Sequence, residues 1–203
     1  MTWQVDIISM SFGFPSRAMD GYAQLETALL NAYNHRVLLF AAASNSGGRL
    51  GRAFPARDPN VIAVHAVDAN GNRSDFSPTA SAEAVNLATV GEGVESAWPV
   101  HLCDEDKNPA LVSVRSGTSY ATPILAGIAG FLLSYVRVNM PDVADILRRR
   151  DKMEKLLRRV AVKGSNYEPR DGYHFVDLSL YADSMFGKAK EFIDGTIRDV
   201  LNE

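Results

Sequence analysis

Cysteine is almost absent from this sequence of 203 residues, and the single one, Cys103, excludes an intramolecular disulfide. Cys103 lies in a polar stretch and is interpreted as a bystander thiol. The four histidines are scattered, so no cluster for a metal ion can be assembled, and we expect neither a metal nor a cofactor. An excess of positive charge is also lacking. The formal net charge of −3 gives no reason to expect nucleic acid or an anionic membrane as a partner.

Long hydrophobic runs are lacking as well. The longest, residues 124–136, is too short to span a bilayer and is predicted to be a buried helix. The first residues run directly into a strand pattern, so we expect no signal peptide there. The length and the hydrophobic share of 46% are sufficient for one domain with a sizeable core.

Short apolar runs alternate with amphipathic stretches along the chain. We expect strands over residues 5–12, 37–43, 61–67 and 84–90, a short edge strand over 173–176, and helices over 21–35, 124–136, 141–160 and 188–201. Residues 91–108 are predicted to be a polar loop. The arginine clusters of the helix 141–160 are interleaved with acidic residues, which indicates a solvated face. Alternating strands and helices predict an α/β fold with a parallel sheet.

Residues 116–123 read Ser-Gly-Thr-Ser-Tyr-Ala-Thr-Pro and form a turn of small residues that feeds the predicted helix 124–136. A serine hydroxyl at such a point stands over a helix N-terminus, whose free N–H groups favour negative charge. Gly117 allows the backbone to approach a ligand closely. One alternative is a plain Ser/Thr helix cap. Another, the nucleophile turn of α/β-hydrolases, is disfavoured because Ala121 replaces its last glycine and Pro123 follows.

The run Gly117-Thr118-Ser119-Tyr120-Ala121-Thr122-Pro123 resembles the nucleophile motif of the subtilisin-like serine proteases, the subtilases of peptidase family S8. The resemblance implies a serine endopeptidase that acts on polypeptide substrates, with Ser119 as the nucleophile. It also implies the three-layer α/β fold of that family, built around a parallel sheet. Structural calcium occurs in the family, but no feature of this sequence indicates it.

Asn45 is the candidate for stabilising an oxyanion. It follows the predicted strand 37–43 at its carboxyl end, where the sites of α/β sheets gather. Its side-chain N–H groups can donate to a developing negative charge. An isolated asparagine would be interpreted as a loop cap, but residues 42–47 resemble the oxyanion-hole segment of the family, usually Ala-Ala-Gly-Asn-x-Gly. Ser44 stands where that segment usually has glycine.

The resemblance also implies a substrate groove. Residues 8–13 are similar to the Met-Ser-Leu-Gly segment that pairs with an extended substrate and forms one wall of the specificity pocket. Residues 42–44 would form the other wall, with Ala53 at the floor. The implied substrate-binding residues are Ser11, Phe12, Gly13, Ala42, Ala43, Ser44, Ala53, Gly117 and Thr118. Small walls beside Phe12 predict a roomy pocket that prefers apolar or aromatic residues before the scissile bond.

The rest of the catalytic triad is not recognisable. The family has its aspartate in an Asp-Ser/Thr-Gly turn and its histidine in a His-Gly-Thr helix start, both before the nucleophile. The histidines here are His35, His65, His101 and His174, and none precedes a glycine. His65 is interpreted as a core histidine and His35 as a helix-end cation. Asp194-Gly195-Thr196 imitates the aspartate turn in the wrong order and lies in a helical pattern.

We therefore expect the chain to be the carboxyl-terminal half of a subtilase domain, with the N-terminal part of the fold missing. Residues 1–182 would be the partial catalytic domain and 183–203 a helical extension. The missing half would then be a partner, its absence would leave a sheet edge uncovered, and the chain alone would be inactive. The alternative is a pseudoprotease module that binds peptides without cleaving them. The absence of a signal peptide favours the cytoplasm by default, but the compartment stays open because the true start can lie upstream.

Overall fold

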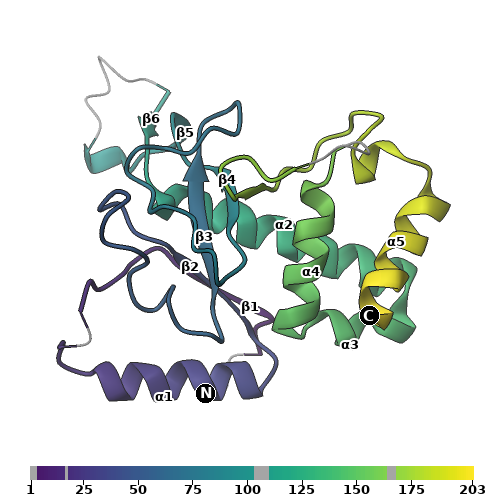
Figure 1. The fold of residues 1–203 in the computed structure, drawn as a ribbon, viewed down its shortest axis with the longest axis horizontal. Coiled ribbons are helices and arrows are strands. Elements are labelled where there is room, and N and C mark those ends of the chain that lie inside the picture. Colours follow the sequence, from purple (N-terminus) through teal and green to yellow (C-terminus); the bar gives the residue numbers. More distant parts are fainter. Residues whose placement is uncertain (1–3, 17, 103–109, 164–167) are drawn as a thin grey trace.

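The computed structural model describes residues 4–16, 18–102, 110–163 and 168–203, so Cys103 lies outside the described part of the chain. A five-stranded parallel sheet with the order β1-β2-β3-β4-β7 forms the centre. Its strands are β1 (Ile7–Met10), β2 (Leu38–Ala42), β3 (Ile62–Val67), β4 (Leu87–Val90) and β7 (His174–Phe175). The α/β class and the parallel sheet predicted from the sequence are confirmed (Figure 1).

β2 is buried over its whole length because helices cover both faces of the sheet. Successive side chains of a strand point to opposite faces. Leu38 accordingly packs in the cluster of α2 (Thr118–Asn139), whereas Leu39 packs in the cluster beneath α1 (Tyr22–Asn34). The sheet is thus the middle of three layers, which can be followed in Figure 1. This double coverage explains why residues 37–43 form a continuous apolar run.

α2 is longer than the helix predicted over residues 124–136. By length and composition it is the one helix of the described chain that could cross a membrane, and half of its most apolar window is buried inside the structure. Its buried residues, among them Leu125, Ala129 and Leu132, lie in the main hydrophobic cluster. A helix that covers a parallel sheet needs such an apolar face.

The single helix predicted over residues 141–160 is interrupted. The chain forms η2 (Pro141–Val143), α3 (Ala144–Leu147) and α4 (Arg150–Ala161), with the break at Arg149, whose backbone is extended (φ −78°, ψ 132°). A continuous helix turns about 100° per residue and would place Leu147 and Leu156 on opposite sides. The break lets both side chains be fully buried.

Residues 183–203 form η3 (Met185–Gly187) and α5 (Lys190–Asn202), so the helix predicted over 188–201 is confirmed. Ile197 and Leu201 of α5 lie in the same hydrophobic cluster as α2 and α4. α4 and α5 stand beside each other in Figure 1. The last helix therefore shares its core with the rest of the described chain.

The prediction of a polar loop over residues 91–108 is wrong in part. β5 (Val94–Ala97) pairs antiparallel with β6 (Val112–Arg115) as a separate two-stranded sheet, and η1 (Val100–Leu102) follows β5. β5 is largely exposed, so its sequence lacks the alternating apolar pattern that marks a half-buried strand. β6 leads directly into the turn before Ser119.

β1 is the terminal strand of the sheet in the described chain. The apolar, β-branched run over residues 5–12 predicts a buried strand, but Ile8 is 36% exposed and Ser9 is exposed as well. No described strand pairs with its outer edge, which explains the difference. A cavity of about 1030 Å³ follows this edge and is lined in part by Val5, Ile8 and Val37.

Candidate active site

Ser119 lies in the first turn of α2, directly after a glycine with unusual backbone angles. Gly117 caps the helix with φ 155° and ψ 155°, and its N–H donates to the carbonyl oxygen of Gly91 at 2.7 Å. A Cβ atom at position 117 would lie 3.0 Å from Nδ2 of Asn45. Glycine is needed here both for its positive φ and for the close approach of Asn45.

Asn45 lies against this turn, although it follows β2 in the chain. Its Oδ1 accepts hydrogen bonds from the main-chain N–H of Thr118 at 2.8 Å and from the Thr118 hydroxyl at 2.9 Å. Because Oδ1 is occupied in this way, Nδ2 is left to present its two N–H groups beside Gly117. Within the described chain Nδ2 donates no hydrogen bond, and Asn45 is exposed. The two N–H groups of the Asn45 carboxamide are therefore free to donate beside Gly117.

Ser119 is half-buried and contacts the segment that follows β1. Its hydroxyl donates to the main-chain oxygen of Ser11 at 3.3 Å, and the hydroxyl of Ser11 donates to the main-chain oxygen of Ser119 at 2.8 Å. The sequence marked Ser11 only as a backbone contact for substrate. Its side-chain bond to α2 has no local signal, because 108 residues separate the two serines.

The two implied walls of the substrate groove lie close to each other. A Cβ atom at Gly13 would lie 2.8 Å from Cβ of Ala53 and 4.0 Å from the oxygen of Ala42. Ala53 in turn donates its N–H to Ala43 at 2.7 Å. Ser11, Phe12 and Gly13 are exposed, whereas Ala42, Ala43, Ala53, Gly117 and Thr118 are buried. The structure thus brings together, around the start of α2, the segments that the sequence singled out.

Ser44 has a backbone conformation that favours glycine. Its φ is 149°, and it is one of four non-glycine residues of the described chain with positive φ. Such a conformation stores strain, of order 1–3 kcal/mol, and strained residues cluster at functional sites. The conformation agrees with the glycine that resembling segments usually have at this position.

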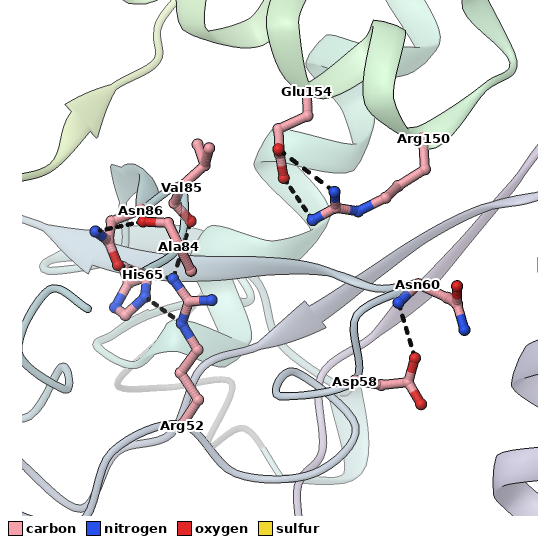
Figure 2. A network of polar contacts seen from close by, with 9 residues as sticks. All are labelled: Arg52, Asp58, Asn60, His65, Ala84, Val85, Asn86, Arg150 and Glu154. Carbon is pink, nitrogen blue, oxygen red and sulfur yellow. Dashed lines mark hydrogen bonds and ion pairs between the residues drawn. The ribbon is translucent and has the colours of Figure 1, made fainter. Parts of the chain in front are cut away.

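His65 is fully buried in β3, as the sequence predicted, and belongs to a polar network shown in Figure 2. Its Nε2 accepts a hydrogen bond from Nε of Arg52 at 3.2 Å. Burial, together with the charge of Arg52, lowers the pKa of His65 to about 3. The imidazole is therefore neutral and committed to Arg52, away from Ser119.

The other histidines belong to three different elements. His35 caps the end of α1 and donates from Nδ1 to the oxygen of Asn31, and His174 lies in β7. Burial, and then the charge of Arg158, lowers the pKa of His174. His101 lies exposed in η1. Within the described residues, Ser119 has no hydrogen bond to any histidine or carboxylate.

Asp194 also does not lie in a turn of the kind that carries the aspartate of the family motif. It lies in α5, where it accepts a hydrogen bond from Tyr135 at 2.9 Å and pairs with Lys190. No group of three or more metal-ligating side chains occurs in the part of the chain that the structure describes.

Comparison with known proteins gives one consistent result. The sequence model of the subtilase family matches residues 2–173. Among curated proteins, the chain is 34% identical to the subtilisin-like protease het-Q2 of Podospora anserina over 67% of its own length and 36% of that protein. It is 37% identical to subtilisin DY of Bacillus licheniformis over 64% of its own length and 43% of that protein. The chain thus spans about two fifths of these relatives.

Solved structures agree with this match. A mutant of the PatA protease domain superposes with a TM-score of 0.61 at 30% identity, covering 86% of this chain and 57% of that one. The prenylagaramide maturation protease PagA superposes with a TM-score of 0.63 at 27% identity, covering 86% of this chain and 60% of that one.

Proposed function

The chain belongs to the subtilase family, and we propose that it carries the nucleophile and the oxyanion donor of a serine endopeptidase. In this proposal the hydroxyl oxygen of Ser119 bonds to the carbonyl carbon of a peptide bond, the C–N bond breaks, and the amine leaves with a proton. Water then hydrolyses the resulting acyl-enzyme and releases the carboxyl product. Asn45 donates to the oxygen on which negative charge develops. Ser11, Phe12, Gly13, Ala42, Ala43, Ser44, Ala53, Gly117 and Thr118 line the path of the substrate.

One observation carries the proposal: the carboxamide of Asn45 is fixed at the turn that bears Ser119. Thr118 holds Oδ1 with two hydrogen bonds, of 2.8 and 2.9 Å, and leaves the N–H groups free. A preorganised donor needs no reorientation when charge develops, which is the source of its catalytic effect. The same turn begins α2, whose N-terminus adds a further favourable potential.

The hydroxyl of Ser119 also needs a base. In the described residues it donates to the main-chain oxygen of Ser11, an acceptor that cannot take the proton. We therefore infer that an aspartate and a histidine from a further polypeptide segment complete the site, and that this chain alone hydrolyses peptides negligibly. In subtilisin, a member of this family, loss of the triad is known to leave roughly 10³–10⁴-fold catalysis over water.

The substrate is proposed to be a polypeptide with an apolar or aromatic residue before the scissile bond. Phe12 is 47% exposed and packs edge-on against Phe14, at 5.9 Å between ring centres. Ala42 and Ala53 have small side chains and lie close to Gly13, the residue between Phe12 and Phe14. No cofactor or metal takes part in the proposed chemistry.

A fluorophosphonate probe tests the proposal, because it reacts with a serine only when that serine is activated. We compare the chain alone with the chain joined at its amino end to a segment that carries the Asp-Ser/Thr-Gly and His-Gly-Thr motifs of the family. Labelling of Ser119 in the joined form, and its loss in a Ser119→Ala variant, supports the proposal. A folded joined form that is not labelled contradicts it.

A second candidate is a module that binds peptides without cleaving them. The bond from Ser119 to Ser11, with no base hydrogen-bonded to Ser119 among the residues that the structure describes, favours this alternative. The same experiment separates the two, because a binding module would retain peptides in both forms without being labelled in either.

A further inference from the structure

Asn45 lies in a loop that is rich in glycine. Residues 44–52 connect Ala43 to Ala53, and the hydrogen bond of 2.7 Å from the N–H of Ala53 to the oxygen of Ala43 closes the loop. Gly47, Gly48 and Gly51 lie inside it, two of them with positive φ. Glycines lose more conformational freedom on folding than other residues, so a defined position for Asn45 needs anchors in the loop.

Two anchors involve the main chain of the glycines. The N–H of Gly47 donates to the oxygen of Phe76 at 2.9 Å, and the hydroxyl of Thr79 donates to the oxygen of Gly48 at 3.0 Å. Both lie in the first half of the loop. They attach it to the segment between β3 and β4.

Arg52 supplies the anchor at the other end. Its guanidinium donates to Nε2 of His65 at 3.2 Å, to the oxygen of Val85 at 2.9 Å and to Oδ1 of Asn86 at 2.7 Å. Figure 2 shows this side chain reaching from the loop to β3 and to the residues before β4. It is the one side chain of residues 44–52 that makes hydrogen bonds to the sheet in the described chain.

The acceptors of Arg52 are themselves rigid. Asn86 is buried and makes further hydrogen bonds to the main chain of Ser81, Ala84 and Gly172. His65 is fully buried, and its ring packs edge-on against Tyr173 at 5.1 Å between centres. A guanidinium that meets fixed acceptors from one end of a loop restrains that end strongly, since its donors have a fixed fork geometry.

The charged groups of α4 also act on Arg52. Burial is the largest influence on Arg52 and lowers the pKa of its guanidinium. The charge of Glu154 favours the charged guanidinium, and the charge of Arg150 opposes it. Glu154 and Arg150 form their own ion pair at 2.6 Å, which Figure 2 shows beside the network. The three hydrogen bonds of Arg52 therefore compensate for the removal of a cation from water.

We propose that Arg52 is a positioning residue, which holds the glycine-rich loop so that Asn45 stays at the start of α2. Its consequence for catalysis rests on the proposed function, but the positional effect itself does not. The bond from the Thr118 N–H to Oδ1 of Asn45 is a direct reporter, because its amide proton is protected from exchange only while Asn45 is in place.

Hydrogen exchange of the full chain, followed by NMR, tests this. Arg52→Met keeps the apolar stem and removes the donors, and Arg52→Lys keeps the charge with fewer aligned donors. We expect Arg52→Met to speed exchange of the Thr118 and Gly47 amides at least roughly tenfold, with partial recovery in Arg52→Lys. The Leu29 amide in α1 serves as the internal reference and should not change.

Arg57→Ala is the matched control, because Arg57 follows the same loop but donates to the oxygens of Phe14 and Pro15. It should leave the Thr118 amide unchanged. Wild-type exchange at Thr118 in Arg52→Met overturns the proposal, as does equal acceleration by Arg57→Ala. If Arg52→Met does not fold, Arg52→Lys decides alone, and wild-type exchange at Thr118 in that variant overturns the proposal.

The joined form described above separates this inference from the proposed function. There, Arg52→Met should lower kcat more than it raises KM, since Asn45 acts on the transition state. Absence of activity in the joined form contradicts the proposed function, while the exchange of Thr118 still decides the role of Arg52.

Discussion

The hydroxyl of Ser11 donates a hydrogen bond to the main-chain oxygen of Ser119, for which the helix itself provides no donor. In an α-helix this oxygen accepts the N–H of the fourth residue onward, here Pro123, which has none. The hydroxyl of Ser11 donates to it instead, at 2.8 Å. The proline that ends the motif around Ser119 thus has a structural consequence: it makes the first turn of α2 dependent on the segment that follows β1.

Removal of this hydroxyl should destabilise the protein. Ser11→Ala leaves the oxygen of Ser119 without its donor, and we expect a loss of about 1 kcal/mol in the free energy of unfolding. Urea denaturation measures this loss. Ser9→Ala is the control, since Ser9 lies exposed in β1 and its hydroxyl makes no hydrogen bond in the described chain; its effect should stay within about 0.5 kcal/mol. Equal midpoints for the two variants contradict the role of Ser11.

Gly117→Ala should displace Asn45. The new Cβ would lie 3.0 Å from Nδ2 at a backbone φ of 155°, so either the loop or the turn must shift. In the joined form we expect fluorophosphonate labelling of Ser119 to fall, at most by roughly the 10²–10³-fold known for loss of the corresponding asparagine of subtilisin.

Gly127→Ala is the matched control for this change. Gly127 lies in the same helix, and a Cβ there would meet nothing within 4 Å. Alanine in an exposed helix position should stabilise the protein by up to about 1 kcal/mol and leave labelling unchanged. Undiminished labelling of Gly117→Ala shows that the Asn45 position does not depend on this glycine.

Ser44→Gly should stabilise the fold. Relief of the strain at φ 149° is of order 1–3 kcal/mol, from which the entropy of a glycine, about 0.5–1 kcal/mol, is subtracted. The net gain expected is about 1 kcal/mol, measured as an upward shift of the thermal midpoint. Ser46→Gly, at a residue without positive φ, should shift the midpoint downward. Shifts of the same sign in both variants contradict the strain at Ser44.

Stability should decrease in mild acid because of His65. Its pKa is about 3 in the folded protein, whereas an unfolded histidine has a pKa near 6.5, so the unfolded chain binds the proton first. The stabilisation is fully present above about pH 6.5 and is lost as the pH falls towards 3, at a little over 1 kcal/mol per unit. Urea midpoints measured between pH 7 and 4.5 report this slope.

His65→Gln should flatten that dependence. His174, whose pKa is also lowered by burial, contributes with the same sign, so a His174→Gln variant is needed to separate the two. The lowered pKa values of Asp6, Asp68, Asp142 and Asp194 act at lower pH, below the ordinary range of a carboxyl. A slope in His65→Gln as steep as that of the original protein contradicts a neutral, buried imidazole.

The hydrophobic pattern of the sequence was sufficient to predict strands that are buried over their whole length. β2 and β3 are covered on both faces, so residues 37–43 and, apart from His65, residues 61–67 are apolar and are recognisable as buried strands. β5 has no such cover, and its short exposed strand is stabilised by pairing with β6, a partner that its own sequence does not indicate. The break at Arg149 likewise depends on where Leu147 must pack.

In the candidate site, too, some features could be predicted from local sequence and others could not. The motif around Ser119 and the segment around Asn45 each have a recognisable sequence, and both lie at the start of α2. The hydrogen bonds that hold these two segments have no recognisable sequence pattern. Ser11 bonds to Ser119 across 108 residues, and Arg52 bonds to His65, which the sequence indicated only as a core histidine. Such long-range side-chain contacts are decided by tertiary packing.

The closure of the loop between Ala43 and Ala53 makes its tip a tolerant place for added sequence. Leu50 is 71% exposed, while Gly47 and Arg52 hold the flanks. The entropic cost of closing a loop rises only with the logarithm of the loop's length, by about 0.6 kcal/mol for each doubling. An epitope or a fluorescent tag inserted at Leu50 would therefore lie a few residues from Asn45 and still leave the sheet intact.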